Sequence, residues 1–211
     1  MPAPATDLLA EVAAYCSAKL AEHGPTPRGV DWNGAESQPL RFEQLGRIVD
    51  TASHFSINDI GCGYGALLDF LAARHTAFSY TGVDVSAEMV RAASQRHQAR
   101  ANARFMHAAT PGEAADYGIA SGVLNVRLSR SDDEWAGYLE GVLDVLDQTS
   151  ERGFAFNCLT SYSDADRMRS DLYYADPCAL FDLCKRRYSP HVALLHDYGL
   201  YEFTILVRKR R

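Results

Sequence analysis

The stretch Ile57-Asn58-Asp59-Ile60-Gly61-Cys62-Gly63-Tyr64-Gly65 decides the fold of this chain of 211 residues. An apolar, strand-like segment runs into three glycines at alternate positions, and a helical pattern follows. Glycines at this junction remove every Cβ, so the backbone can turn tightly and approach a ligand at van der Waals distance. One helix length later comes Tyr80-Thr81-Gly82-Val83-Asp84, which ends in a carboxylate placed to accept hydrogen bonds from ribose hydroxyls. Together the two stretches predict a site for an adenosine-like cofactor.

The spacing of the glycines indicates which cofactor binds. A dinucleotide fingerprint has the pattern G-x-G-x-x-G, with a helix N-terminus directed at a pyrophosphate. Here the pattern is G-x-G-x-G, and the acidic Asp59 lies inside the turn. A carboxylate there would repel a pyrophosphate and would suit the ammonium group of an amino acid. The turn therefore favours S-adenosylmethionine over NAD.

These motifs resemble those of a known family. Asp59-Ile60-Gly61-Cys62-Gly63-Tyr64-Gly65 is similar to motif I of the class I SAM-dependent methyltransferases, and Gly82-Val83-Asp84-Val85-Ser86 resembles their second motif. The resemblance is specific over about residues 57–126. It implies a Rossmann-like fold, an enzyme of the EC 2.1.1 class, and S-adenosyl-L-methionine as the cofactor, with S-adenosyl-L-homocysteine as its product.

Size and charge limit the remaining possibilities. A hydrophobic content of 47% over this length predicts one packed domain. The net charge of −6 argues against a broad phosphate-binding surface, so nucleic acid is not an expected partner. The five cysteines contain no C-x-x-C pair, and neither a signal peptide nor a membrane-spanning apolar run is present. We therefore expect a cytoplasmic protein with no bound metal and no membrane contact.

The pattern along the chain predicts an α/β fold. Strands are expected at residues 56–60, 78–83, 104–107, 117–121 and 153–159, and helices at residues 6–23, 40–52, 66–74, 86–100, 132–147 and 177–187. Residues 192–196 and 201–207 are joined by a turn too short for a parallel crossover, so they are expected to form an antiparallel hairpin. The prediction is a Rossmann-like seven-stranded sheet with six parallel strands, one antiparallel C-terminal strand and helices on both faces. Residues 1–52 are expected to form an N-terminal helical extension, or lid, on a methyltransferase domain of residues 53–211.

Ligands bind beyond the carboxyl ends of the strands in such sheets. This rule gives the candidate cofactor residues Asp59, Gly61, Gly63, Tyr64, Asp84, Val85, Ala108 and Ser121. The family often has an acidic residue after the third strand, but this chain has His107-Ala108-Ala109-Thr110 there. Recognition of adenine is thus left unassigned, with backbone groups near Ala108 and Ala109 as one option.

Trp32 and Arg41 come from the turn-rich N-terminal segment. As parts of a lid, Trp32 would pack on the sulfonium, because an aromatic face attracts a cation. Arg41 would then pair with the methionine carboxylate. The alternative is that Trp32 pins the N-terminal helix to the sheet.

Three residues are candidates for the chemistry of the acceptor. His196 is a possible general base, because histidine titrates in the useful range; alternatively, it is a strand-end histidine bonded to backbone. Asn125 is a candidate for orienting a substrate hydroxyl or carboxylate. Tyr174 belongs to the insertion of residues 160–176, which is expected either to set specificity or to be a solvated loop.

These residues lead to a ranked set of functions. The first is methyl transfer to a small polar molecule at oxygen, such as a sugar or a biosynthetic intermediate, by in-line displacement in a monomer or homodimer. The Asn/Asp-Pro-Pro-aromatic motif of amide and nucleobase methylation is absent after the fourth strand. The alternatives are methylation of a protein or RNA, and a non-catalytic SAM-binding scaffold.

Overall fold

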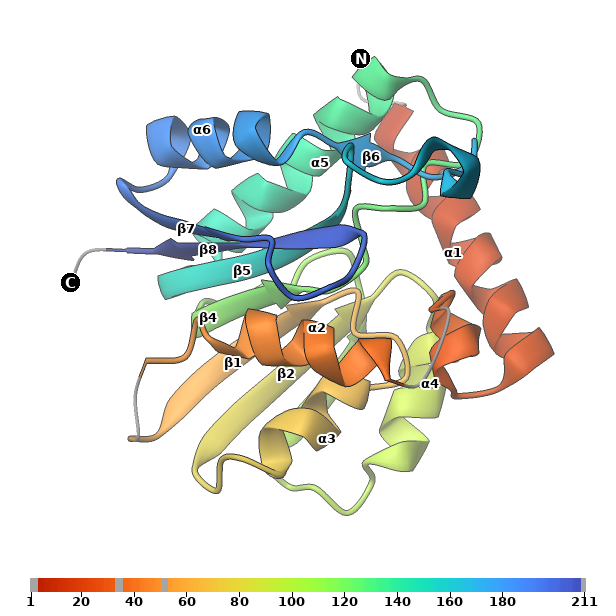
Figure 1. Ribbon diagram of the computed structural model, residues 1–211. Helices are drawn as coiled ribbons and strands as arrows, with labels where there is room; N and C mark the ends of the chain where they lie inside the picture. Colours follow the sequence, from red (N-terminus) through yellow and green to blue (C-terminus); the bar gives the residue numbers. More distant parts are fainter. Residues whose placement is uncertain (1–3, 33–35, 51–52, 210–211) are drawn as a thin grey trace.

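The chain folds around one mixed β-sheet, seen in the computed structural model of Figure 1, which describes residues 4–32, 36–50 and 53–209. The strand order is β3-β2-β1-β4-β5-β8-β7. The strands are β1 Phe55–Ile60, β2 Phe78–Asp84, β3 Ala103–His107, β4 Ala115–Ala120, β5 Ser150–Thr160, β7 His191–Leu195 and β8 Glu202–Arg208. A short additional strand, β6 Tyr174–Ala175, pairs with the end of β5.

The directions of the strands confirm the predicted topology. The pairs β1–β2, β1–β4, β2–β3 and β4–β5 are parallel. β8 is antiparallel to both β5 and β7, so β7 and β8 form the hairpin that the short turn between them requires. β6 was not predicted, because two residues are too few to give an alternating pattern.

Helices cover the sheet in layers. They are α1 Pro4–His23, α2 Ser37–Gly46, α3 Ala66–Ala72, α4 Ala87–Arg96, α5 Asp132–Gln148 and α6 Pro177–Arg187, with 3₁₀ turns η1 Pro27–Val30 and η2 Ala165–Arg167. In Figure 1, α2 and α3 lie in front of the sheet, α5 and α6 lie on its other face, and α1 crosses the end where the parallel strands terminate. α2 ends at Gly46, earlier than predicted, and residues 51–52 of the expected helix lie outside the described residues.

Local sequence explains where several helices begin. Ser86 caps α4 by accepting a hydrogen bond from the Met89 backbone N–H at 3.1 Å. Ser131 and Glu134 form a reciprocal capping box at the start of α5. Asp176 caps α6, whose first residue is Pro177.

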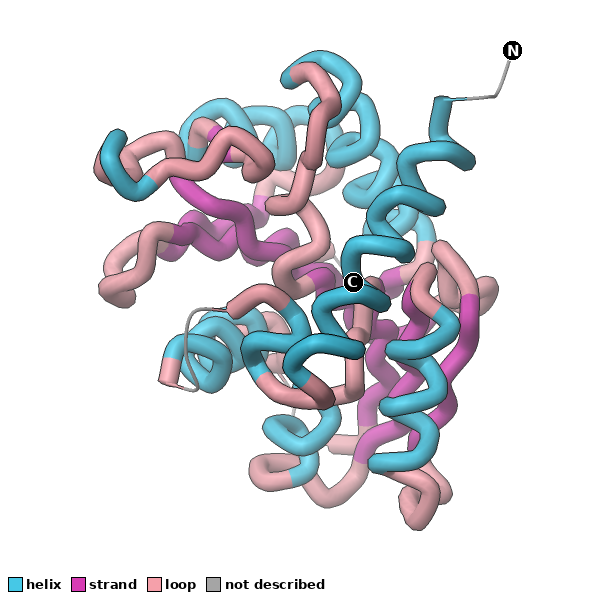
Figure 2. The backbone as a smooth tube through the Cα atoms, turned by 90° about the vertical axis from the view of Figure 1, so that its right-hand side faces the viewer, coloured by secondary structure: helices cyan, strands magenta, loops and turns pink. Residues whose placement is uncertain are grey.

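The connection from β3 to β4 is unusually short for a parallel crossover. Residues 108–114 contain no helix, so within the described part of the chain no helix covers β1, β2 and β3 on the face opposite α3 (Figure 2). Near the start of these strands the side chains on that face are polar and bond to one another or to the loop before β4. The Arg104 side chain donates to Thr81 Oγ1 at 2.9 Å, and the Asn58 amide donates to the Glu113 carbonyl at 2.9 Å. Towards the strand ends the same face turns apolar with Ile60 and Val83, and the space there becomes a cavity.

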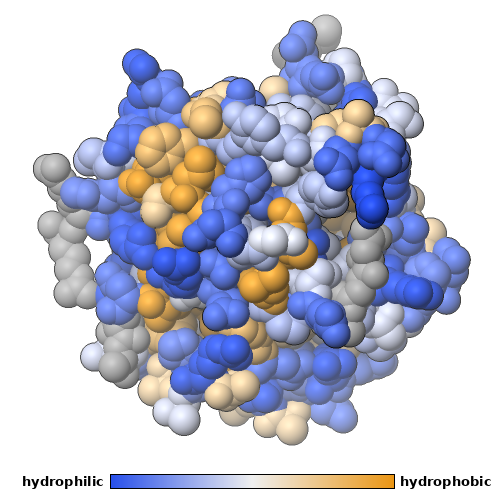
Figure 3. Space-filling view, viewed as in Figure 1, coloured by the Kyte–Doolittle hydropathy of each residue, from blue (hydrophilic) through white to orange (hydrophobic). Residues whose placement is uncertain are grey.

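Two apolar layers enclose the sheet. The layer under α2 and α3 includes Leu45 and Leu68, and the layer under α5 and α6 includes Leu143 and Phe156, all fully buried. The surface seen in Figure 3 is mostly hydrophilic, with apolar atoms gathered towards α6 and β7. No helix within the described residues combines the length and the apolar character needed to cross a membrane.

Candidate functional site

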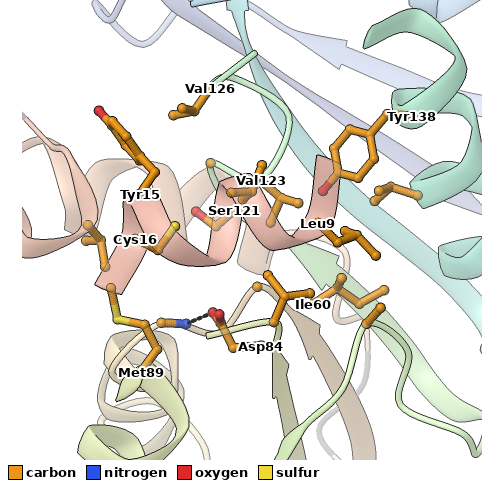
Figure 4. Close-up of a pocket in the computed structure, with 18 of the residues that line it drawn as sticks. Leu9, Tyr15, Cys16, Ile60, Asp84, Met89, Ser121, Val123, Val126 and Tyr138 are labelled. Carbon is orange, nitrogen blue, oxygen red and sulfur yellow. Dashed lines mark hydrogen bonds between the residues drawn. The ribbon is translucent and has the colours of Figure 1, made fainter. Parts of the chain in front are cut away.

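A cavity of about 410 Å³ opens where β1, β2 and β4 end (Figure 4). α1 and η1 close it from one side, the strand ends form its floor, and α5 forms a further wall. Of the predicted cofactor residues, it is lined by Gly61, Gly63, Asp84, Val85, Ala108, Ser121 and Trp32. The rest of the wall is largely apolar, with Leu9, Val12, Ile60, Met89, Val123, Val126 and Val145 among its residues. The rule of the strand ends thus places most of the predicted cofactor residues in one site.

The glycine turn forms the part of the floor that follows β1. Gly61, Gly63 and Gly65 have φ values of 68°, 54° and 82°, a region that side chains rarely adopt. A Cβ on Gly61 would lie 2.3 Å from a methyl group of Val123, and one on Gly65 would lie 2.8 Å from the His97 ring. Only glycine fits at positions 61 and 65, and the resulting bare backbone is the cradle that an adenosine-type cofactor needs.

Asp84 is fixed by backbone groups of two different segments. Its carboxylate accepts hydrogen bonds from the Gly63 N–H at 2.9 Å and from the Ser86 N–H at 2.8 Å. Burial raises the pKa of this carboxyl, while the backbone N–H groups oppose the rise. A carboxylate has about four acceptor positions, and these backbone donors do not use all of them. The residues present therefore fit a ribose, whose hydroxyls would occupy those remaining positions.

Asp59 lies on the other side of the turn, in a smaller space of about 40 Å³. The phenol of Tyr80 donates to its carboxylate at 2.5 Å. Burial is the main reason that its pKa rises to about 7, and the charge of Asp84 adds to the rise. A buried carboxylate with one neutral donor lacks a cation. It therefore fits the ammonium group of the cofactor's amino-acid end.

Trp32 borders both spaces, whereas Arg41 lines neither. The Arg41 guanidinium carbon lies 3.7 Å from the centroid of the Trp32 ring, and its Nε donates to Glu202 at 2.6 Å. Two of the Arg41 nitrogens already donate to Glu202. The guanidinium is therefore not free to form the predicted two-bond pair with the cofactor carboxylate. Tyr64 lines only the smaller space, where its hydroxyl donates to Gln38 at 3.1 Å.

The three predicted acceptor residues do not line the cavity. His196 is exposed directly after β7, the last strand of the sheet order, with its ring 6.0 Å from the Tyr162 ring. Asn125 is buried and accepts the Leu159 N–H at 3.1 Å. The Tyr174 hydroxyl accepts the Arg169 N–H at 2.9 Å. The structure gives Asn125 and Tyr174 contacts that fix the segments around β5 and β6.

Several residues of the cavity were not predicted from the sequence. Tyr15 and Lys19 of α1 reach the mouth together with Asp31. The Tyr15 hydroxyl donates to Asp31 at 2.7 Å, and the Lys19 ammonium lies 3.1 Å from the same carboxylate. Asp31 has a φ of 60°, in the left-handed region. The helical periodicity that predicted α1 carried no information about which part of the sheet α1 would cover.

Two glycines in the interior of α5 also line the cavity. Gly137 and Gly141 are one turn apart, and a Cβ on either would have no atom within 4 Å. Glycine inside a helix costs up to about 1 kcal/mol relative to alanine. Packing therefore does not require these glycines. Two glycines four residues apart lie on the same face of a helix, so the sequence could have indicated that this face of α5 borders a ligand.

Near the cavity, two buried side-chain atoms have no hydrogen-bond partner among the described residues. One borders the cavity itself, and the other belongs to the side chain that stacks on Trp32. They are Oγ of Ser121, which lines both spaces, and Nη1 of Arg41. Among the described residues, no cluster of three or more His, Cys, Asp or Glu side chains is arranged to hold a metal ion.

Fold and site together define a class I SAM-dependent methyltransferase. Residues 57–148 match the family model described as a methyltransferase domain. The chain is 68% identical over 163 residues to Rv1506c of Mycobacterium tuberculosis (strain ATCC 25618 / H37Rv), a protein named provisionally as a methyltransferase. That match covers 77% of this chain and 98% of the relative. The chain belongs to this methyltransferase family.

Solved structures share the fold at low sequence identity. Magnesium protoporphyrin IX methyltransferase from Synechocystis PCC 6803, solved with bound SAM, has a TM-score of 0.68 at 16% identity, covering 95% of this chain and 97% of that one. The N-methyltransferase NodS from Bradyrhizobium japonicum WM9, solved with S-adenosyl-L-homocysteine, has a TM-score of 0.65 at 16% identity, covering 94% and 98%. These likenesses support the fold.

Proposed function

We propose that this protein transfers the methyl group of S-adenosylmethionine to an oxygen of a small polar molecule. The observation that carries the proposal is the pair of buried carboxylates on either side of the glycine turn. Asp84 faces the larger cavity and Asp59 the smaller one. This separation suits one molecule with a ribose at one end and an ammonium group at the other.

The chain's own residues orient the reactants and exclude water. Asp59 would hold the ammonium group and Asp84 the ribose hydroxyls, while Val85, Ala108 and Val123 flank the space left for adenine. When bound, S-adenosylmethionine supplies an electrophilic methyl group on a sulfonium. Methyl transfer then depends mainly on alignment and on a dry site, and the apolar wall provides such a site.

The size and the mouth of the cavity support a small acceptor with a hydroxyl group. The adenosine part of the cofactor would fill most of the cavity of about 410 Å³, so only a small acceptor would fit beside it under α1. The polar groups at the mouth belong to Tyr15, Lys19 and Asp31. The Asp31 carboxylate there already accepts from Tyr15 and pairs with Lys19 and Arg169, so a substrate hydroxyl would use its remaining acceptor position. Location in the cytoplasm is supported by the five cysteines, all of which are free thiols.

Turnover tests this function directly. The protein, supplied with S-adenosylmethionine and a fractionated pool of small hydroxyl-bearing metabolites, is expected to form S-adenosylhomocysteine only in fractions that contain the acceptor. The Asp84→Ala variant should form about tenfold less at limiting cofactor. Tight binding of S-adenosylhomocysteine with no turnover in any fraction would contradict the small-molecule assignment. Turnover with a protein or RNA fraction alone would also contradict it.

A further inference from the structure

Arg41 of α2 and Glu202 of β8 form a buried ion pair between residues that are 161 positions apart in the sequence. Arg41 Nε donates to Oε2 at 2.6 Å, and Nη2 donates to Oε1. Arg41 is 7% exposed and Glu202 is 2% exposed. Two parallel bonds fix the plane of a guanidinium as well as its position.

Both members of the pair also contact groups that lead to the cavity. The guanidinium carbon lies 3.7 Å from the centroid of the Trp32 ring. On the other side, Glu202 accepts from the Asn157 amide at 2.6 Å, and Asn157 accepts from the Gly122 N–H at 2.9 Å. The cavity is lined by Trp32 and Gly122, which also touch each other, because a Cβ on Gly122 would lie 2.5 Å from the indole. The pair is thus linked to two neighbouring pieces of the cavity wall.

The energetics of burial argue for a role other than stability. Replacing a buried ion pair with apolar side chains of similar volume is often neutral or stabilising. Arg41 Nη1 has no hydrogen-bond partner among the described residues, so part of its desolvation is not compensated. An apolar pair could not replace the planar guanidinium that stacks on the Trp32 ring and holds it in one orientation.

We propose that Arg41 is a positioning residue whose pair with Glu202 fixes the indole of Trp32 and the Gly122 amide at the junction of the two spaces. This inference rests on the proposed function, in which that junction receives the sulfur-bearing middle of the cofactor. Arg41 acts there through Trp32 and does not contact the cofactor carboxylate itself.

The experiment measures the mobility of Trp32 and the binding of S-adenosylhomocysteine separately. The chain contains two tryptophans, so a Trp135→Phe background isolates the emission of Trp32. In that background we compare Arg41→Lys with the apolar double variant Arg41→Met/Glu202→Leu. Melting temperature, acrylamide quenching of Trp32 without ligand, and affinity for S-adenosylhomocysteine are measured for each.

The double variant removes the acceptor of the buried Asn157 amide along with the ion pair, so it is expected to melt below its parent by no more than the loss of one buried hydrogen bond accounts for. Its Trp32 quenching should rise about twofold or more as the ring is released, and its affinity should fall about tenfold. Arg41→Lys should show the same two changes, because lysine keeps the charge but loses the planar fork. The matched control is Arg152→Met, which removes an arginine that is paired with Asp50 and lies 4.9 Å over the Tyr117 ring, away from the cavity. It should leave Trp32 quenching and affinity unchanged.

Unchanged Trp32 quenching in both Arg41 variants would overturn the proposal. If affinity nevertheless falls, Arg41 contacts the ligand directly. Quenching is measured without ligand, so this result can be separated from failure of the proposed function, in which the protein with both tryptophans would not bind S-adenosylhomocysteine. If the double variant does not fold, Arg41→Lys alone decides the outcome.

Discussion

The carboxylate of Asp84 accepts a hydrogen bond of 2.9 Å from the backbone N–H of Gly63, and this bond joins the end of β2 to the turn that follows β1. The two residues lie 21 positions apart and approach each other because β1 and β2 are adjacent parallel strands. A single side chain therefore holds the glycine turn and faces the cavity. The shape of the cofactor cradle depends on that side chain.

Replacing Asp84 should weaken both the turn and the binding of the cofactor. Asp84→Ala leaves the buried N–H groups of Gly63 and Ser86 without an acceptor, which costs about 1–3 kcal/mol each at most. We expect a lower melting temperature and about tenfold weaker binding of S-adenosylhomocysteine by titration calorimetry. Asp116→Ala is the matched control, because Asp116 accepts the Ser56 N–H at 2.7 Å outside the cavity. Equal loss of affinity in both variants would assign the effect of Asp84 to stability alone.

The raised pKa of Asp59 predicts binding that depends on pH. Because this pKa lies at about 7, the carboxyl is mostly protonated at pH 6, and pairing with an ammonium group should release close to one proton. Affinity for S-adenosylhomocysteine should increase about tenfold per pH unit below pH 6 and about fivefold between pH 6 and pH 7. Calorimetry at pH 6 in buffers of different ionisation enthalpy measures the proton. An Asp59→Asn variant with the same pH dependence would show that another group is responsible.

Asp59 should also affect the stability of the protein without ligand. Its unfolded-state pKa has the ordinary low value, so between about pH 4 and pH 7 the folded state holds a proton that the unfolded state has lost. The free energy of unfolding contributed by this group therefore falls as pH rises through that window. Asp59→Asn should be more stable than the parent at pH 8 and no more stable at pH 4. Denaturant unfolding at the two pH values checks this, and a stabilisation of equal size at both would contradict it.

Substitutions at the α5 glycines should separate stability from ligand binding. Gly141→Ala should stabilise the protein by up to about 1 kcal/mol, since alanine is the better helix former. Gly141→Leu should keep that gain but fill the cavity, weakening ligand binding about tenfold or more. Ala136→Leu, outside the cavity lining, is the control for a larger side chain on the same helix. Unimpaired binding by Gly141→Leu would show that ligands do not use this wall.

Asp31 connects α1 with the insertion between β5 and β6. Its carboxylate accepts a hydrogen bond from the Tyr15 hydroxyl and pairs with the Lys19 ammonium. Nη1 of Arg169, in that insertion, lies 3.4 Å from the same carboxylate. Asp31→Asn keeps a side chain that tolerates the left-handed backbone but removes the charge. We expect faster amide hydrogen exchange over residues 24–32 and weaker cofactor binding, with little change in melting temperature. Unchanged exchange would mean that the charge does not hold η1 in place.

Local patterns predicted the parts of the site that lie close together in the sequence. Gly61, Gly63 and Asp84 were identified because a strand, a tight turn and a second strand leave a pattern that can be read within 30 residues. The hairpin of β7 and β8 followed from the length of one turn. The Arg41–Glu202 pair spans 161 positions, so no local pattern could reveal it.

The principle that ligands bind beyond the carboxyl ends of the strands identifies a whole edge of the sheet, but not a position along that edge. His196 follows β7 and lies at that edge, but β7 is the last strand of the order, far from the junction of β1 and β4 where the cavity opens. The docking of α1 across this edge depends on tertiary packing of Leu8 and Val12 against Trp135. Periodicity predicts such a helix but not the surface that receives it.

A crystal structure of the protein with S-adenosylhomocysteine tests the central claim most directly. We expect the ribose hydroxyls within hydrogen-bond distance of the Asp84 carboxylate and the ammonium group at Asp59, with the glycine turn between them. A ligand bound elsewhere, or one bound with its amino-acid end at Asp84, would contradict the assignment of the site.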